Sequence, residues 1–445
     1  MQHRLLSKNL KFFIALLLPV AVIIVFSCKK DPFICMNGLM REPYLQMAGS
    51  DQIIIKWRTC YATESLVRYG ISPGNLKDSA LIEEGKTDHE VHLTNLQPGT
   101  KYYYSVGTRN EILQGNIDNY FVTHPKEGDS KSTRIWVTGD AGSGDLLQRR
   151  VRDSYIRYAA GKPADMWLWL GDNAYEDGTD DEYQKAVFTN SYEKLMKNIC
   201  VWPAIGNHDF ANVGYNSAQA VSGHFPYYDI FALPENGESG GLPSGTEKYY
   251  SFNYGDIHII CLDSYSSANH LGSSMHNWLQ QDLSRNTSKW TIVFMHHPPY
   301  TMGSHNSDKE KESIDVRNNI LPILEKYSVD LVLTGHSHSY ERSYMLNGHY
   351  GNSTELSNDH IMGRHDGRMH QPYVKSKESK GTVYAVVGVS GRLGGKKSDW
   401  PHPAMAYASV NKGGSMVIDI DGNQLHAKFI GTSANVLDEF AIIKK

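Results

Sequence analysis

Five short, mainly apolar runs of this chain each end in side chains of a kind that binds metals, and this feature most constrains the fold. The runs are residues 134–138, 166–170, 201–205, 291–295 and 331–334, and Gly, Pro or polar residues bound each of them. Such runs predict buried β-strands. Polar residues directly after strands are typical of open α/β sheets, which bind ligands at the carboxyl ends of their strands.

The polar residues that follow these runs form a candidate metal-binding set. Their oxygen and imidazole donors suit Fe, Mn or Zn. Two metal ions roughly 3.5–4 Å apart would clamp the attacking and leaving oxygens of a displacement at phosphorus. Asp172 is the predicted bridge between two such ions, because it stands between the other Asp and the Asn in the order of candidates. The seven candidates are Asp140, Asp172, Tyr175, Asn207, His296, His336 and His338.

The five segments resemble the motif set of the purple acid phosphatases, a branch of the metallophosphoesterase superfamily. The resemblance covers roughly residues 40–443 and matches at all seven candidates, of which Tyr175 marks the purple type. It implies an Fe(III) ion held by Asp140, Asp172, Tyr175 and His338. It also implies a divalent Fe, Zn or Mn ion held by Asp172, Asn207, His296 and His336.

The resemblance also implies a reaction. An acid phosphatase of this type hydrolyses phosphomonoesters by attack of a metal-bound hydroxide on phosphorus at a dinuclear metal centre. His208 matches the substrate-facing histidine of the family, which contacts phosphate and protonates the leaving group. The same site also fits a phosphodiesterase or a nucleotidase. A catalytically silent surface-binding lipoprotein is the alternative from another class of protein.

Other histidines in the chain carry less specific signals. His305 and Asp308 follow the fourth run and are candidates for the wall of a substrate pocket. His297 is interpreted as a structural histidine, with support of its neighbour His296 as the alternative. Residues 345–380 hold four histidines at irregular spacing, which favours a solvated flap over a further metal site.

Length and patterning predict two domains of the α/β class. Residues 133–445 are expected to form a two-sheet α/β sandwich covered by helices, one of them at residues 180–197. A hairpin is expected around residues 421–423. Residues 38–124 read as an all-β sandwich similar to a fibronectin type III domain, because short runs alternate with turn residues. The formal net charge is −4, and the sequence contains no basic stripe. Both features argue against a dedicated nucleic-acid partner.

The first residues of the chain predict export. Three basic residues precede an apolar stretch at 12–26, which suits a signal peptide over residues 1–27. Residues 25–28 resemble a bacterial lipobox, so Cys28 is the expected lipidation site. This predicts a membrane-anchored lipoprotein at the periplasm or cell surface, with an uncleaved N-terminal anchor as the alternative. Cys35 and Cys60 could pair in an oxidising compartment.

Overall fold

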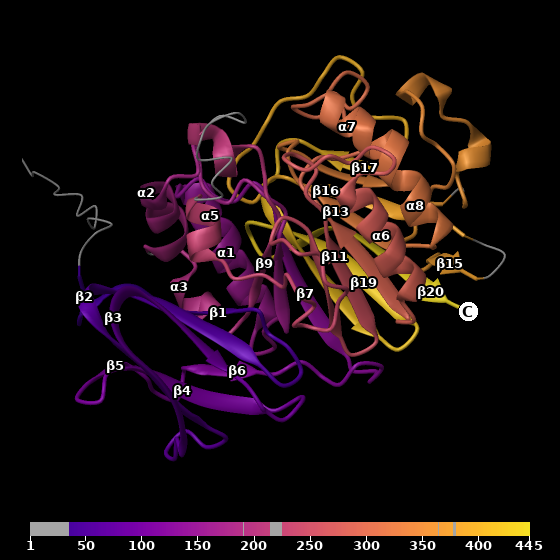
Figure 1. Ribbon diagram of the computed structural model, residues 1–445. Helices are drawn as coiled ribbons and strands as arrows, with labels where there is room; N and C mark the ends of the chain where they lie inside the picture. The colour runs from indigo at the N-terminus through magenta and orange to yellow at the C-terminus, as the bar shows by residue number, and fades with distance from the viewer. Residues whose placement is uncertain (1–34, 190, 214–224, 364, 377–379) are drawn as a thin grey trace, which may run out of the picture. The chain divides into compact units, whose positions relative to one another are not determined.

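A computed structural model describes residues 35–189, 191–213, 225–363, 365–376 and 380–445 (Figure 1). The predicted signal peptide and Cys28 lie outside the described residues. The described residues from 35 to 445 form one compact unit. Within the described ranges, the structure has no helix of the length and apolar character needed to span a membrane.

The N-terminal part is all-β, as predicted, and we call it the β domain. Its six antiparallel strands are β1 (Leu39–Gln46), β2 (Ile53–Gly70), β3 (Asp78–Leu93), β4 (Lys101–Gly107), β5 (Ile112–Gln114) and β6 (Tyr120–Val122). The long strand β2 continues through irregular register between Arg58 and Ser65, which bends the strand without ending it. Cys35 and Cys60 form a disulfide.

The rest of the described chain is built around two seven-stranded sheets, which confirm the predicted α/β sandwich. The first sheet has the strand order β15 (Tyr373–Lys375), β20 (Val436–Lys444), β19 (Gln424–Gly431), β18 (Gly414–Asp421), β7 (Thr133–Thr138), β8 (Met166–Trp169) and β9 (Val201–Pro203). The second has the order β10 (Tyr250–Tyr254), β11 (Ile257–Cys261), β12 (Trp290–Phe294), β13 (Leu331–Thr334), β16 (Val383–Val387), β14 (Tyr340–Ser343) and β17 (Met405–Ser409). The expected hairpin is β18–β19, closed by the pair Asp421 and Gln424.

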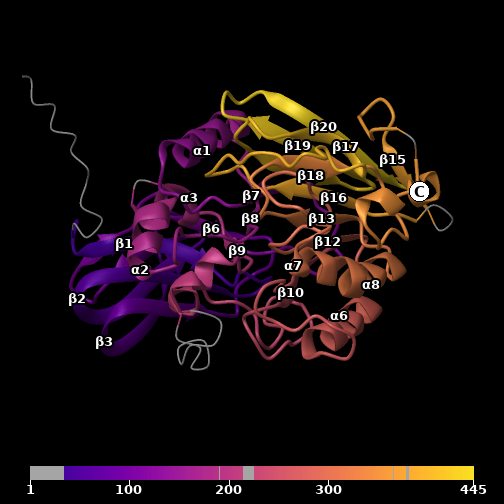
Figure 2. The ribbon, with the colours of Figure 1, turned by 90° about the horizontal axis from the view of Figure 1, so that it is seen from above.

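Helices cover the outer faces of the two sheets (Figure 2). On the first sheet, α1 (Leu146–Ala159) places Tyr155 against Trp136 of β7, with ring centroids 3.9 Å apart. On the second, apolar residues of α6 (Ser274–Arg285) and α8 (Leu321–Lys326) pack against β12 and β13. Shorter helices are α5 (Pro226–Ile230), α7 (Lys311–Asp315), η2 (His208–Val213), η3 (Val316–Ile320), η4 (Ser353–Glu355) and η5 (Asn358–His360).

The predicted continuous helix at 180–197 is wrong. The chain forms three short pieces instead, α2 (Asp180–Tyr183), η1 (Gln184–Phe188) and α3 (Glu193–Met196). A capping box starts α2, in which Thr179 accepts from the backbone of Glu182. The wider turn of η1 places Gln184 against Arg41 of the β domain, so contacts with a distant part of the sequence override the local helical pattern.

Candidate metal centre

The loops that carry the predicted ligands meet at the carboxyl ends of five strands. In the first sheet β7, β8 and β9 run parallel, and in the second β12 and β13 run parallel. The two sheets therefore bring their loops to one place, as expected for ligand sites in α/β proteins. The structure brings together all seven predicted side chains there.

Three of the candidates have backbone angles that few non-glycine residues adopt. The φ angles of Asp140, Asp172 and His336 are 54°, 54° and 65°. Such left-handed conformations cost free energy and cluster at functional sites. Gly206 is required for close approach, because a Cβ there would lie 2.2 Å from Oδ1 of Asp172.

Asp140, Tyr175 and His338 form one half of the site. The Tyr175 hydroxyl donates to Oδ1 of Asp140 over 3.2 Å and lies 3.3 Å from Nε2 of His338. That Nε2 atom is 3.5 Å from Oδ1 of Asp140. Three donor atoms thus converge on one point from the loops after β7, β8 and β13.

Asn207, His296 and His336 form the other half. Oδ1 of Asn207 lies 3.1 Å from Nε2 of His296 and 3.1 Å from Nδ1 of His336. Nε2 of His296 is 3.4 Å from Oδ1 of Asp172. Single ligand atoms of Asp140, Asp172 and His296 all lie within 4.8 Å of one another. Asp172 therefore stands between the two halves, where a bridging carboxylate is required.

Burial shapes the titration of these groups. Burial raises the pKa of Asp172, but the charges of His296 and His208 outweigh it and the net pKa is lowered. Burial and the charge of Asp140 raise the pKa of the Tyr175 hydroxyl well above its usual value. Tyr175 therefore keeps its proton unless a cation displaces it, and a bound metal ion is the kind of charge that does so. The buried, hard donor set fits two such ions.

His208 lies beside these two halves with a defined tautomer. Its backbone N–H donates to Oδ1 of Asp172 over 2.9 Å, and its ring centroid is 4.8 Å from that of Tyr175. Its Nδ1 is 2.7 Å from the carbonyl oxygen of Glu176. Because a carbonyl only accepts, Nδ1 carries a proton, and Nε2 is the nitrogen that can exchange a proton with a substrate.

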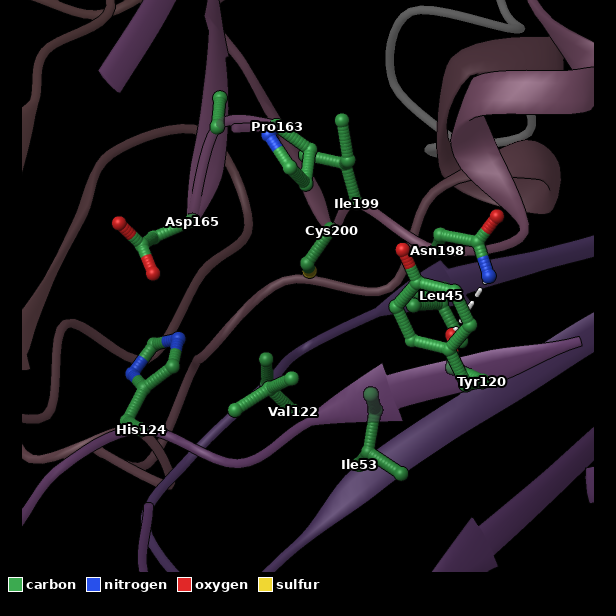
Figure 3. Close-up of a pocket in the computed structure, with 12 residues that line it drawn as sticks. Leu45, Ile53, Tyr120, Val122, His124, Pro163, Asp165, Asn198, Ile199 and Cys200 are labelled. Atoms are coloured by element: carbon green, nitrogen blue, oxygen red, sulfur yellow. Dashed lines mark hydrogen bonds between the residues drawn. The ribbon is translucent and has the colours of Figure 1, made fainter. Parts of the chain in front are cut away.

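A separate cavity of about 80 Å³ lies between the β domain and the β7–β9 part of the first sheet (Figure 3). His124, Asp165 and Cys200 are among its twelve lining residues, and none of the seven candidates is. Burial raises the pKa of the Cys200 thiol to about 12, so this cysteine stays neutral and unreactive. The cavity is not part of the candidate metal centre.

Two family models match successive segments of the chain. The model described as the N-terminal domain of purple acid phosphatase matches residues 41–123, and that of the calcineurin-like phosphoesterases matches residues 133–340. The chain belongs to the purple acid phosphatase family. Family membership and the cluster of His and Asp donors together indicate a dinuclear metal centre.

Several curated plant proteins of this family match about two thirds of the chain. It is 27% identical to probable purple acid phosphatase 20 of Arabidopsis thaliana over 316 residues, which are 68% of each protein. It is 25% identical to a purple acid phosphatase of Glycine max over 351 residues, 77% of this chain and 68% of the relative. For purple acid phosphatase 15 of Arabidopsis thaliana, 27% identity extends over 61% of this chain and 55% of the relative.

Solved structures show the same fold. A purple acid phosphatase isolated from yellow lupin seeds superposes with a TM-score of 0.69 at 18% identity, covering 92% of this chain and 75% of the other. The structure of PhoD superposes with a TM-score of 0.64 at 14% identity, covering 91% and 90%. At this identity the superpositions report on the fold alone.

Glu310 also borders the site, and the sequence analysis did not predict it. Its Oε2 lies 3.3 Å from Nε2 of His336, and its carboxylate is 3.0 Å from Nδ1 of His305. The rings of His305 and His336 are 3.8 Å apart, so the predicted substrate-binding histidine does border the site. Burial raises the pKa of Glu310, but hydrogen bonds from His305 and His336 outweigh it and lower the net pKa.

Asp209 is a second residue that sequence reasoning missed. Its carboxylate accepts from the backbone N–H groups of Asp172, Asn173 and Gly206, over 3.1, 2.9 and 2.7 Å, and from the Tyr183 hydroxyl over 2.7 Å. It therefore ties together two of the loops that carry candidate ligands. Its position directly after Asn207 and His208 was the available sequence signal.

The other singled-out residues have structural surroundings. Asp308 accepts from the backbone and hydroxyl of Ser353. Buried His297 lies 3.0 Å from the Ser264 hydroxyl, as expected for a structural histidine, although its ring is 4.3 Å from that of His336. His349, from the expected flap, is buried with its ring centroid 5.5 Å from that of Tyr300, so a solvated flap is wrong at this position.

Proposed function

We propose that this protein is an acid phosphatase that hydrolyses phosphomonoesters at a centre of one Fe(III) and one divalent Fe, Zn or Mn ion. The observation that carries this proposal is the position of the Tyr175 hydroxyl, 3.2 Å from Asp140 and 3.3 Å from His338. A phenol in that place supplies a hard anionic donor suited to a ferric ion. Asp172 is the proposed bridge to the second ion, which Asn207, His296 and His336 would hold.

The proposed reaction assigns separate roles to the metal ions, to His208 and to His305. Two bound cations supply Lewis acidity and lower the pKa of water. The carbonyl of Glu176 holds Nδ1–H of His208, so in the imidazolium form Nε2 carries a second proton that it can transfer to the leaving oxygen, which is general acid catalysis. His305, held by Glu310 beside His336, is placed to hydrogen bond the phosphate oxygens.

A spectrum and two substrates test this function. Protein purified without chelators is expected to contain iron and to absorb in the visible through Tyr175. Tyr175→Phe should lose that band while keeping its fold and part of its turnover. A colourless, iron-free and fully active wild type would instead indicate a Mn or Zn enzyme.

The substrate class is tested separately. We expect faster turnover of p-nitrophenyl phosphate than of bis-p-nitrophenyl phosphate. The opposite ranking would favour the phosphodiesterase alternative over the monoesterase, and the absence of both activities in a metal-loaded preparation would favour a silent binding protein.

We further propose that the protein is an exported lipoprotein with the lipid on Cys28. The disulfide between Cys35 and Cys60 supports an oxidising compartment, since such bonds are rare in the cytosol. Cys28→Ser should release the protein from the membrane fraction or leave its precursor uncleaved. A processed, membrane-bound Cys28→Ser protein would refute lipidation at this residue.

A further inference from the structure

An acidic residue at the start of α2 connects the β domain with the rest of the chain. Asp180 accepts from Arg41 of β1 through Oδ1 over 2.6 Å. It accepts from Arg58 of β2 through Oδ2 over 2.6 Å and Oδ1 over 3.2 Å. Figures 1 and 2 both show α2 beside these strands. Charge-assisted, two-pronged bonds of this kind fix orientation as well as distance.

Arg41 holds the residues that follow Asp180 as well. Its side chain is 2% exposed, and its Nε donates to Oε1 of Gln184 over 2.7 Å. Its guanidinium lies 4.6 Å from the ring centroid of Phe188. Gln184 in turn donates to the carbonyl of Met40 over 3.1 Å. The β domain thus contacts both α2 and η1, through hydrogen bonds to Asp180 and Gln184 and through the ring of Phe188.

The opposite side of α2 holds the loop that carries Tyr175. The Glu182 carboxylate accepts from the backbone N–H groups of Glu176, Asp177 and Thr179, over 2.6, 3.0 and 3.0 Å. Three backbone N–H groups within the four residues after Tyr175 therefore depend on one side chain of α2. Loops without such bonds exchange among many conformations.

A second contact leads from α2 to the other ligand loops. Tyr183, next to Glu182, donates to Asp209, the carboxylate that ties the loops of Asp172 and Gly206 together. A helix of four residues has no stability of its own, so tertiary contacts determine where it lies. The two arginines supply those contacts from the β domain.

We propose that Arg41 and Arg58 are positioning residues for the metal centre, which act through Asp180 and α2 on the loops of Tyr175 and Asp172. The inference rests on the proposed function only in taking Tyr175 and Asp172 as metal ligands. It gives the β domain a part in site assembly that goes beyond packing.

Hydrogen exchange of the whole chain tests the inference without any metal. In Asp180→Asn, the amides of residues 176–179 should exchange at least about tenfold faster, since a hydrogen bond to a charged group is worth roughly 1.5–3 kcal/mol. Asp88→Asn is the matched control, because Asp88 also pairs with Arg58 but lies within the β domain, in β3. It should exchange as the wild type does. Equal exchange in wild type and Asp180→Asn would overturn the inference.

Metal retention supplies the second readout. Asp180→Asn should lose iron or zinc to a chelator at least about tenfold faster than wild type and Asp88→Asn, for the same energetic reason. Wild-type retention in a folded Asp180→Asn protein would overturn the inference. If the wild type binds metal but hydrolyses no phosphate ester, the proposed function fails while this comparison still decides the positioning role.

A double-mutant cycle tests whether Asp180 acts on the Tyr175 loop through Glu182 or only through a general loss of stability. Glu182→Gln should mimic Asp180→Asn, and the double variant should lose little more than either single variant, because both changes cut one connection. Fully additive losses would contradict a route through Glu182. Where Asp180→Asn does not fold, Arg58→Met replaces it, because this change leaves the bond from Arg41 in place.

Discussion

The guanidinium of Arg392 lies over the ring of Tyr175, 3.7 Å from the ring centroid. Arg392 also pairs with Glu176, the residue whose carbonyl fixes His208. A cation above a phenol stabilises its electron-rich, ionised form. Arg392 therefore adjusts the donor strength of Tyr175 from outside the ligand set.

The first prediction concerns this stacking. Arg392→Met should move the visible band of Tyr175 to longer wavelength, by about 1–2 kcal/mol in transition energy, the size of a cation–π interaction. Arg392→Lys keeps the charge and should shift the band less. Visible spectra of the three iron-loaded proteins are the measurement. An unchanged band in Arg392→Met would show that the cation does not act on Tyr175.

The second prediction concerns Asp172, the proposed bridge. Asp172→Asn removes the charge that two cations would share, so the variant should retain little metal and lose turnover by orders of magnitude. Elemental analysis and turnover of p-nitrophenyl phosphate check this. Near-normal metal content and turnover would refute a bridging role for Asp172.

The third prediction concerns proton transfer by His208. His208→Ala should slow alkyl phosphates about 10²–10⁴-fold, the usual worth of general acid catalysis, and aryl phosphates with good leaving groups far less. The measurement is kcat/KM across a series of leaving groups. An equal loss along the series would leave His208 with a role in positioning only.

The candidate ligands could be predicted from sequence because they follow buried strands directly. A strand fixes the direction of the residue that follows it. Asp140, Asp172 and His336 therefore come together once their strands lie parallel in the two sheets. Two parallel stretches of sheet supply that meeting point. Local pattern and fold agree in this part of the chain.

The supports of the site could not be predicted in the same way. Asp180 meets Arg41 across 139 positions of sequence, and Arg392 meets Glu176 across 216. No local pattern marks such pairs, since each charged residue alone reads as a solvated surface residue. The failure of the helix predicted at 180–197 has the same origin, because contacts of Gln184 with the β domain set its conformation.

The last prediction concerns His124, a buried histidine where the β domain meets the first sheet. It is 2% exposed, and its Nδ1 donates to the carbonyl of Asn253 over 3.0 Å. Within the described part of the chain, its Nε2 has no hydrogen-bond partner; this atom points toward the cavity of Figure 3. Burial lowers the pKa of His124 to about 4. The hydrogen bond to Asn253 opposes this shift, and the charge of Lys131 lowers the pKa further.

A folded-state pKa below the unfolded value of about 6.5 makes folding sensitive to acid. Above that value both states are neutral and His124 has no effect on the pH dependence. As the pH falls from 6.5 toward 4, the unfolded chain binds a proton that the folded chain rejects, and stability falls. One pKa unit corresponds to about 1.4 kcal/mol, so His124 alone should remove roughly 2–3 kcal/mol by pH 4.5.

His124→Asn tests this, because the amide can keep the bond to Asn253 but does not titrate. The variant starts less stable at pH 7, since it loses the ring contact with Tyr254, but its free energy of unfolding should fall less steeply with acid. Urea titrations at pH 7 and pH 4.5 measure both quantities. The control is His270→Asn, at an exposed histidine whose Nδ1 bonds the carbonyl of Leu271, which should keep the wild-type slope. Equal slopes in His124→Asn and wild type would mean that His124 is already protonated in the fold at pH 4.5.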